Sequence, residues 1–317
     1  MLQLETPSAP DAPPVFAADI GGSFIRFAYS ARPGSLELLD RLPTPAGNWT
    51  AFVDALHGLL ERHANGTDAP LAISIAGLVD PADGKAFSAN IPCITGHRLE
   101  QELGERLGRR VFAANDADCL ALAEAGEGAG AGHRIVFCAV LGTGVGGGLV
   151  AEGRLIRGAG GLSGEWGHGP ILNTTVELEG EGQITIPRFA CGCGQQGCVD
   201  TIGGARGIER LHQFLNAEEK DSYGILTAWQ DGDLPAHRTI SAYLQLVADP
   251  LSAVVNITGA SVVPIGGGLA NATPLIAELD KAVRQRILRR VDEPLVVPGK
   301  FSSDGGLIGA AVLGRRS

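Results

Sequence analysis

The chain has 317 residues, 44% of them hydrophobic and 19% charged, a balance typical of folded globular proteins and not of disordered chains. This length allows about two domains, and no apolar run approaches the roughly 18 residues of a membrane helix. The formal net charge of -10 makes nucleic acid a poor partner. We expect neither nucleic acid nor a membrane as a partner. An anionic ligand would have to be bound by backbone amides, a helix N-terminus or a bound cation.

The N-terminal stretch, MLQLETPSAPDAPP, contains acids and prolines but no Lys or Arg. It therefore lacks the basic and apolar regions of a signal peptide. We expect a short disordered lead over residues 1–14 and a cytoplasmic protein.

The next elements follow a pattern of strand, glycine turn and strand. VFAADI, GGS and FIRFAYS begin at Val15, and HRIVFCAVLGTGVGGGLVAEGRLI repeats the pattern over 133–156. The repeat indicates an internal duplication. Periodicity further predicts a helix over 50–64, strands at 71–79 and 109–115, a helix from Asp116, a strand at SVVPI, and helices from about Pro274 and within DGGLIGAAVLG.

These elements predict two α/β domains. The N-terminal domain is expected over 15–120 and the C-terminal domain over 121–303. The final helix, within 304–317, is expected to pack back on the N-terminal domain.

Two glycine-rich turns are candidates for binding phosphate, because glycines let successive amides point into one concavity and let an anion approach the backbone. Ser23 and Thr143 add hydroxyl donors, and Asp19 is a natural partner for the magnesium that accompanies ATP. The residues are Asp19, Gly21, Gly22 and Ser23 in the first turn, and Gly142, Thr143, Gly144, Gly146, Gly147 and Gly148 in the second.

Either turn alone is more typical of a plain hairpin. The second also matches the G-x-G-x-x-G pattern of dinucleotide-binding folds, but a strand-like segment, GLVAEGRLI, follows it where that fold requires a helix. The G-x-x-x-x-G-K-[ST] pattern of P-loop proteins is absent from the sequence.

Three cysteines, Cys191, Cys193 and Cys198, lie within the segment CGCGQQGC, and His168 in GEWGHG lies upstream. Three thiolates and one imidazole make the ligand set of a closed, structural zinc site. A strained disulfide or a set of reactive thiols is the alternative, and it is less typical of an intracellular chain. Zinc on one ring nitrogen of His168 would leave the other free to hydrogen-bond a ligand.

The segment ANDAD places Asn115 and Asp116 where a buried strand ends and a helix begins. A carboxylate there can accept a proton from an attacking hydroxyl, as phosphoryl transfer requires. A helix N-cap is an equally good interpretation of this segment. Asp118 is a second carboxylate, which we expect to complement the helix dipole.

Taken together, DIGGS, NDAD, GTGVGGG, GEWGH, CGCGQQGC and the late GGG resemble, in this order, the ROK family of sugar kinases and repressors. The resemblance implies an actin-like ATPase (ribonuclease H-like) fold of two α/β domains, with nucleotide and sugar in a central cleft. Family repressors carry a helix-turn-helix domain before the first turn. Only 18 residues precede Asp19, so we expect a kinase.

Carried over by position, the resemblance implies roles for individual residues. Asp116 is the implied catalytic base, His168 and the three cysteines the zinc ligands, and the two turns the phosphate sites. The implied sugar contacts are Gly77, Asn90, Asn115, Asp116, Glu165, His168 and Asp200, and Gly266, Gly267 and Gly268 are expected near the adenosine. ATP, Mg²⁺ and structural Zn²⁺ are the implied cofactors, and the family resemblance implies a homodimer.

Within the family the chain is most similar to bacterial N-acetylglucosamine kinases. The segments that carry this resemblance are SANIP (88–92), the spacer between GEWGH and CGCG, and VVPIGGGLAN. Ser23 replaces the usual Thr, Phe24 stands where those kinases tend to have Lys, and Asp200 stands where the family usually has Glu. The expected reaction is transfer of phosphate from ATP to the 6-hydroxyl of N-acetyl-D-glucosamine. Glucokinase, N-acetylmannosamine kinase and a non-catalytic sugar-binding regulator are the alternatives.

Overall fold

The computed structural model describes residues 12–301 and 303–316, which form two compact units. The first unit comprises the described residues up to Glu127, Arg154–Ser163 and the described residues from Ser303. The second comprises Gly128–Gly153 and the described part of Gly164–Ser302. Residues 1–11 of the predicted disordered lead lie outside the described residues.

The first unit is built on a five-stranded sheet in the order β3-β2-β1-β4-β7. β1 pairs with β2 antiparallel and with β4 parallel, and β4 pairs with β7 parallel. Its elements are β1 (Val15–Ile20), β2 (Phe24–Ser30), β3 (Glu37–Pro43), α1 (Trp49–His63), β4 (Leu71–Ile75), β5 (Leu78–Val79), β6 (Ala86–Phe87), α2 (Leu99–Leu107), β7 (Val111–Asn115), α3 (Asp116–Glu127), β10 (Arg154–Leu155) and α9 (Gly305–Arg316).

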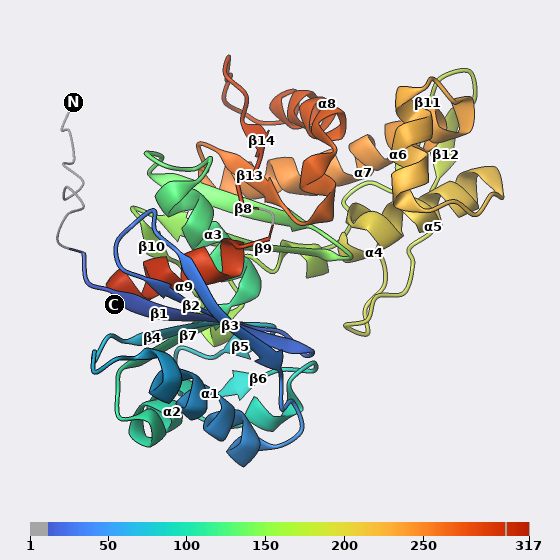
Figure 1. The fold of residues 1–317 in the computed structure, drawn as a ribbon. Coiled ribbons are helices and arrows are strands. Elements are labelled where there is room, and N and C mark those ends of the chain that lie inside the picture. Colours follow the sequence, from blue (N-terminus) through green and yellow to red (C-terminus); the bar gives the residue numbers. More distant parts are fainter. Residues whose placement is uncertain (1–11, 302, 317) are drawn as a thin grey trace. The chain divides into compact units, whose positions relative to one another are not determined.

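Alternate residues of β1 face opposite sides of this sheet, as strand geometry requires. Phe16, Ala18 and Ile20 lie in one buried apolar cluster with Phe52 of α1 and Leu103 of α2. The opposite side is covered by α9, which contacts β1, β4 and α3, and Figure 1 shows α1 and α2 on one side of the sheet and the red α9 on the other. Asp19 is on the side that α9 covers.

The predicted strand over 71–79 is wrong in its second half. β4 ends at Ile75, and β5 begins at Leu78 in a separate pairing with β6. The chain leaves the ladder at Ala76 and Gly77, where a Cβ on Gly77 would lie 2.6 Å from the carbonyl oxygen of Phe87. Only glycine allows this close approach.

The second unit contains a sheet with the same arrangement of four strands, β9-β8-β13-β14. β8 pairs with β9 antiparallel and with β13 parallel, and β13 pairs with β14 parallel. This matches β2-β1-β4-β7 and agrees with the predicted duplication. The elements are β8 (Ile135–Leu141), β9 (Val145–Ala151), β11 (Thr175–Leu178), β12 (Gly182–Thr185), α4 (Asp200–Gly203), α5 (Ala205–Asn216), α6 (Ser222–Gln230), α7 (Leu234–Thr258), β13 (Val263–Gly266), α8 (Thr273–Arg284) and β14 (Val296–Pro298).

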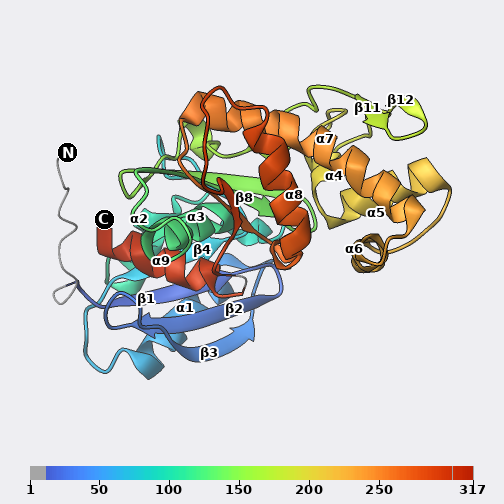
Figure 2. The ribbon, with the colours of Figure 1, turned by 90° about the horizontal axis from the view of Figure 1, so that it is seen from above.

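The long helix α7 forms much of the core of the second unit. It contacts α5, α6 and α8, and Figure 2 shows it running past these helices. By length and composition it is the one helix among the described residues that is apolar enough to span a membrane, and 56% of that apolar window is buried inside the unit. Burial of this extent is typical of a core helix.

Candidate functional site

The first glycine turn joins β1 to β2. Its hairpin is closed by a hydrogen bond from the Gly21 N–H to the Phe24 carbonyl at 3.1 Å. A Cβ on Gly22 would lie 2.9 Å from the carbonyl oxygen of Asn90, so the predicted sugar contact Asn90 packs directly against this turn. Gly22 and Ser23 in this turn are exposed.

Asp19 is held in one orientation by two neighbours. Arg26 donates from Nη2 to Oδ2 at 2.9 Å, and Ser74 donates its hydroxyl to Oδ1 at 2.9 Å. A carboxylate has about four acceptor positions, so Asp19 keeps acceptor capacity for the hydration shell of a divalent cation. This donor set fits magnesium, which is commonly held by one or two carboxylates and several waters.

Asn115 and Asp116 lie at the junction of β7 and α3, as predicted. The Asn115 amide donates to the Gly77 carbonyl at 3.0 Å, and its side-chain oxygen accepts from the Ala117 N–H at 2.8 Å. Asn115 therefore fixes this junction and brings Gly77 to it. Asp116 is exposed, whereas Asp118 is only 5% exposed. The accessible carboxylate of this segment is thus Asp116.

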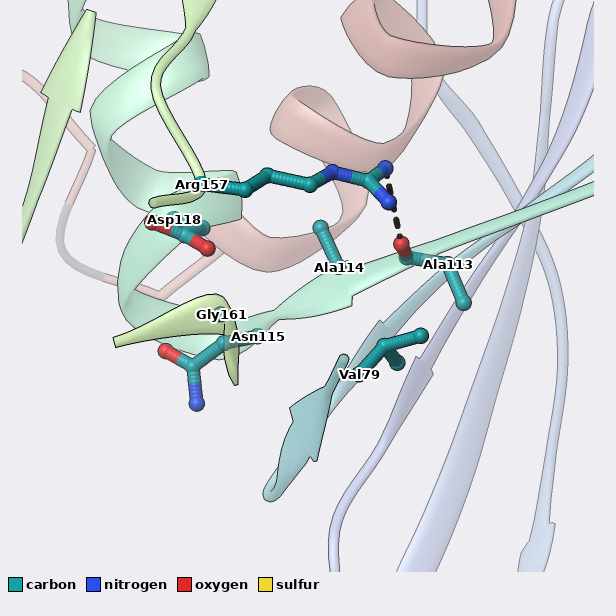
Figure 3. Close-up of a pocket in the computed structure, with 7 residues that line it drawn as sticks. All are labelled: Val79, Ala113, Ala114, Asn115, Asp118, Arg157 and Gly161. Carbon is teal, nitrogen blue, oxygen red and sulfur yellow. Dashed lines mark hydrogen bonds between the residues drawn. The ribbon is translucent and has the colours of Figure 1, made fainter. Parts of the chain in front are cut away.

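A cavity of about 10 Å³ lies beside this junction, room for about one water molecule. Figure 3 shows its lining, with Arg157 reaching over Ala113 of β7 and Asn115 at its edge. Arg157 donates to the Ala113 carbonyl at 3.1 Å, while Glu100 accepts from the Ala113 N–H at 2.8 Å. The two side chains lie 3.6 Å apart.

This arrangement protects an edge strand. β7 is the last strand of its sheet, so the outward backbone groups of Ala113 have no strand to pair with. Glu100 and Arg157 take the place of the next strand. They hold β7 two residues before Asn115.

We expect Arg157→Met to lower the free energy of unfolding by about 1 to 2 kcal/mol, because a partly buried carbonyl then loses a charged hydrogen-bond donor. Denaturant unfolding of the purified protein measures this change. Arg154→Met, an exposed arginine of the same segment, is the matched control. Equal stability of the two variants would contradict the proposed role of Arg157.

The second glycine turn joins β8 to β9 in the second unit. The Gly142 N–H donates to the Gly144 carbonyl at 2.9 Å, and the Val145 N–H donates to Oδ1 of Asp200 at 2.7 Å. A Cβ on Gly267 would lie 2.6 Å from the nitrogen of Gly142, and Gly267 has a φ of +81°, which favours glycine. The segment Gly266–Gly268 therefore packs on this turn, and Asp200 is attached to it.

The four predicted metal ligands lie together. One ligand atom from each of His168, Cys191, Cys193 and Cys198 lies within 4.8 Å of all the others. The Sγ atoms of Cys193 and Cys198 are 3.7 Å apart, and Cys191 Sγ is 3.6 Å from His168 Nδ1. Two thiolates on a tetrahedral zinc lie about 3.8 Å apart, given a Zn–S distance of about 2.3 Å. The donor set and its spacing fit zinc.

The thiols of this cluster differ in acidity. A hydrogen bond from the Gln195 backbone lowers the pKa of Cys193 to about 7, while burial and the neighbouring thiols raise the pKa of Cys198 to about 12. Adjacent thiols resist joint ionisation unless a cation binds them. The cluster is therefore suited to a metal and poorly suited to three free thiolates.

His168 presents its two ring nitrogens to different neighbours. Nδ1 faces Cys191, and Nε2 lies 3.9 Å from a carboxylate oxygen of Glu165. Burial raises the pKa of Glu165. A metal on Nδ1 would leave Nε2 beside Glu165, where both side chains can contact a polar ligand.

Each unit thus gathers its own share of the predicted site residues. The first gathers the turn at Asp19 with Asn90, Gly77 and Asn115, and the second gathers the turn at Gly142 with Asp200 and Gly266–Gly268. Sequence reasoning missed Arg26, Ser74 and Arg157, which support these residues. They carry no local signal, because each meets its partner only through strand pairing or a long loop.

The comparisons with known proteins agree with this arrangement. The sequence matches the ROK family over residues 15–317. It is 33% identical over 300 residues to proteins named N-acetyl-D-glucosamine kinase from Salmonella newport and Salmonella typhimurium, covering 94% of this chain and 98% of each relative. Among solved structures it is similar to the ROK hexokinase from Thermus thermophilus, with a TM-score of 0.78, 29% identity, and 94% and 97% of the two chains covered.

A second structure is that of a ROK family glucokinase from Streptomyces griseus, in complex with glucose and AMPPNP. It has a TM-score of 0.72 and 25% identity, and covers 96% of this chain and 100% of that one. The fold and these relatives define a sugar kinase with the actin-like ATPase fold, which confirms the predicted fold class and enzyme class. The chain belongs to the ROK family.

Proposed function

We propose that the chain transfers the γ-phosphoryl group of ATP to the 6-hydroxyl of N-acetyl-D-glucosamine. The observation that carries the proposal is the exposed carboxylate of Asp116 at the end of β7, next to an Asn115 whose amide is fixed on Gly77. The relatives named N-acetyl-D-glucosamine kinase support the choice of sugar.

In this reaction Asp116 accepts the proton of the 6-hydroxyl as its oxygen attacks the γ-phosphorus. The bond between the γ-phosphorus and the bridging oxygen breaks, and ADP leaves. Such a transfer depends mainly on positioning and charge stabilisation. We assign Gly77, Asn90 and Asn115 of the first unit to the sugar, and likewise Glu165, His168 and Asp200 of the second unit.

For the phosphates we assign the turn at Asp19, Gly21, Gly22 and Ser23 in the first unit and the turn at Gly142 to Gly148 in the second. Gly266–Gly268 are assigned to the adenosine. Asp19 is the residue that would hold magnesium through its hydration shell, and magnesium when bound neutralises charge on the phosphate oxygens. Arg26 and Ser74 orient Asp19 for this role.

We further propose that the His168 and cysteine cluster holds one structural zinc ion. The zinc stabilises the loop that carries His168 and orients this side chain, and it takes no part in the chemistry. A cytoplasmic location, a homodimer and the absence of nucleic-acid and membrane partners stay predictions from the sequence.

A coupled assay of ADP release across N-acetylglucosamine, glucose and N-acetylmannosamine tests the choice of sugar. We expect kcat/KM to be at least about 10-fold higher for N-acetylglucosamine than for either other sugar. The ratio approaches ~10⁴ if buried groups hydrogen-bond the acetamido group, because those groups are left unpaired when it is absent.

Equal or higher kcat/KM for glucose would make the chain a glucokinase, and the same result for N-acetylmannosamine would favour that kinase. Sugar binding without ATP consumption on any hexose would contradict a kinase and support a regulator. Direct calorimetric binding of each sugar separates these outcomes.

A further inference from the structure

Three charged residues stand in one row across the first three strands of the sheet, on the side that α9 covers. Asp19 of β1 pairs in register with Arg26 of β2, and Arg26 pairs with Arg41 of β3. Phe24 is two residues before Arg26 on β2 and therefore points to the same side. Like charges directly opposite each other on neighbouring strands are unfavourable. The positive charges of Arg26 and Arg41 must therefore be stabilised by other groups.

Arg26 is compensated by carboxylates. It donates to Asp19 at 2.9 Å and to Asp304 at 2.8 Å, and also to the backbone carbonyl of Ser303 at 2.6 Å. These bonds use most of the guanidinium's donors. Arg26 therefore has little charge or donor capacity left for a further anion.

The positive charge of Arg41 is stabilised in a different way. Its guanidinium lies 3.8 Å from the ring centroid of Phe24, and within the described ranges no carboxylate oxygen lies within 4.0 Å of it. Stacking on a ring fixes the plane of the guanidinium while its N–H groups stay at the edge, able to donate outward. Arg41 is exposed and Phe24 is 43% exposed, so the pair faces solvent.

The pair adjoins the first glycine turn. Phe24 directly follows Ser23, and the chain after β3 is attached to the turn through Thr44. The Thr44 N–H donates to the Ser23 carbonyl at 2.9 Å, and the Thr44 hydroxyl donates to the Gly21 carbonyl at 2.7 Å. Two hydrogen bonds therefore join the end of β3 to the turn, and the cation on the surface beside them is Arg41.

We propose that Arg41, held over the ring of Phe24, contacts the phosphates of ATP at the first turn. The inference rests on the proposed function, which assigns this turn to the phosphates. It gives Phe24 a role at the position where the similar kinases tend to have Lys: the aromatic ring positions a cation that belongs to the neighbouring strand.

Arg41→Met tests this, because methionine keeps an unbranched side chain but removes the charge. Calorimetric titration with a non-hydrolysable ATP analogue in magnesium buffer should show a rise in Kd of roughly 5- to 20-fold. The affinity for N-acetylglucosamine should stay unchanged. The difference from the wild type should shrink at high salt, since screening weakens an exposed charge interaction.

The double variant Phe24→Lys with Arg41→Met moves the charge to position 24 and should recover most of the lost affinity. Arg106→Met, an exposed arginine on α2, is the matched control and should bind like the wild type. An unchanged Kd in Arg41→Met would overturn the inference, as would a double variant no better than Arg41→Met. Loss of affinity in Phe24→Leu but not in Arg41→Met would also overturn it, because the ring itself would then be the contact.

The wild type separates this inference from the proposed function. If the wild type binds the analogue and phosphorylates a sugar while Arg41→Met is unaffected, only the role of Arg41 fails. If the wild type neither binds the analogue nor consumes ATP, the proposed function fails first.

Discussion

Asp116→Asn is expected to reduce kcat by on the order of 10²- to 10⁴-fold while leaving sugar binding nearly unchanged. A positioned general base contributes an acceleration of this size, and asparagine keeps the shape of the side chain but cannot take up the proton. Measuring kcat by ADP release and sugar affinity by calorimetry separates the two effects. The expected pattern is a fall in kcat at nearly constant Kd.

Asp118→Asn is the matched comparison, because Asp118 lies on the same helix two residues later and is buried. Its replacement should affect stability more than chemistry. Near-normal turnover in Asp116→Asn would refute the assignment of the base. A folded Asp118→Asn variant without turnover would transfer the role to Asp118.

Removal of the metal is expected to have the second large effect. Elemental analysis should find about one zinc per chain, and Cys198→Ser should lose the zinc and about 4 kcal/mol or more of stability, since binding of a structural metal contributes directly to folding. Cys198 is buried, and its Sγ lies 3.7 Å from that of Cys193. Sugar affinity should fall with the metal, because His168 loses its fixed orientation.

The affinity for zinc should also fall steadily as the pH is lowered, because protons compete with zinc for the thiolates, above all for that of Cys198, whose pKa is raised to about 12 in the absence of the metal. Cys93→Ser is the control, since Cys93 lies in the first unit, outside the cluster. A metal-free preparation with full activity and unchanged thermal stability would rule out the structural zinc.

The fold was largely predictable because its signals are local. The glycine turns, the strand at Val15 and the helix that is now α1 are each specified by a few consecutive residues. No helix or strand was predicted in the region between His168 and Ser261. Its helices α5 to α7 and the hairpin of β11 and β12 follow no motif, and they were found only in the structure.

The candidate site divides in the same way. Residues in motifs, such as Asp116 and the cysteines, could be named from the sequence. Their supports could not, because Arg26 and Asp304 are separated by 278 positions along the chain and meet only in the folded unit. The bond between Asp200 and Val145 also joins residues far apart in the chain, at 55 positions, and it attaches Asp200 to the glycine turn.

The place of α9 has a consequence for the order in which the protein forms during synthesis. The first unit needs this helix to cover β1 and β4, and Gly309 fits so closely on α3 that a Cβ there would clash with the Cys119 carbonyl oxygen. Domains generally fold as units while the chain emerges from the ribosome. Every residue of the second unit emerges before α9 does. The half of the protein that is translated first is therefore completed last, and one side of its sheet stays open to chaperones or to aggregation in the meantime.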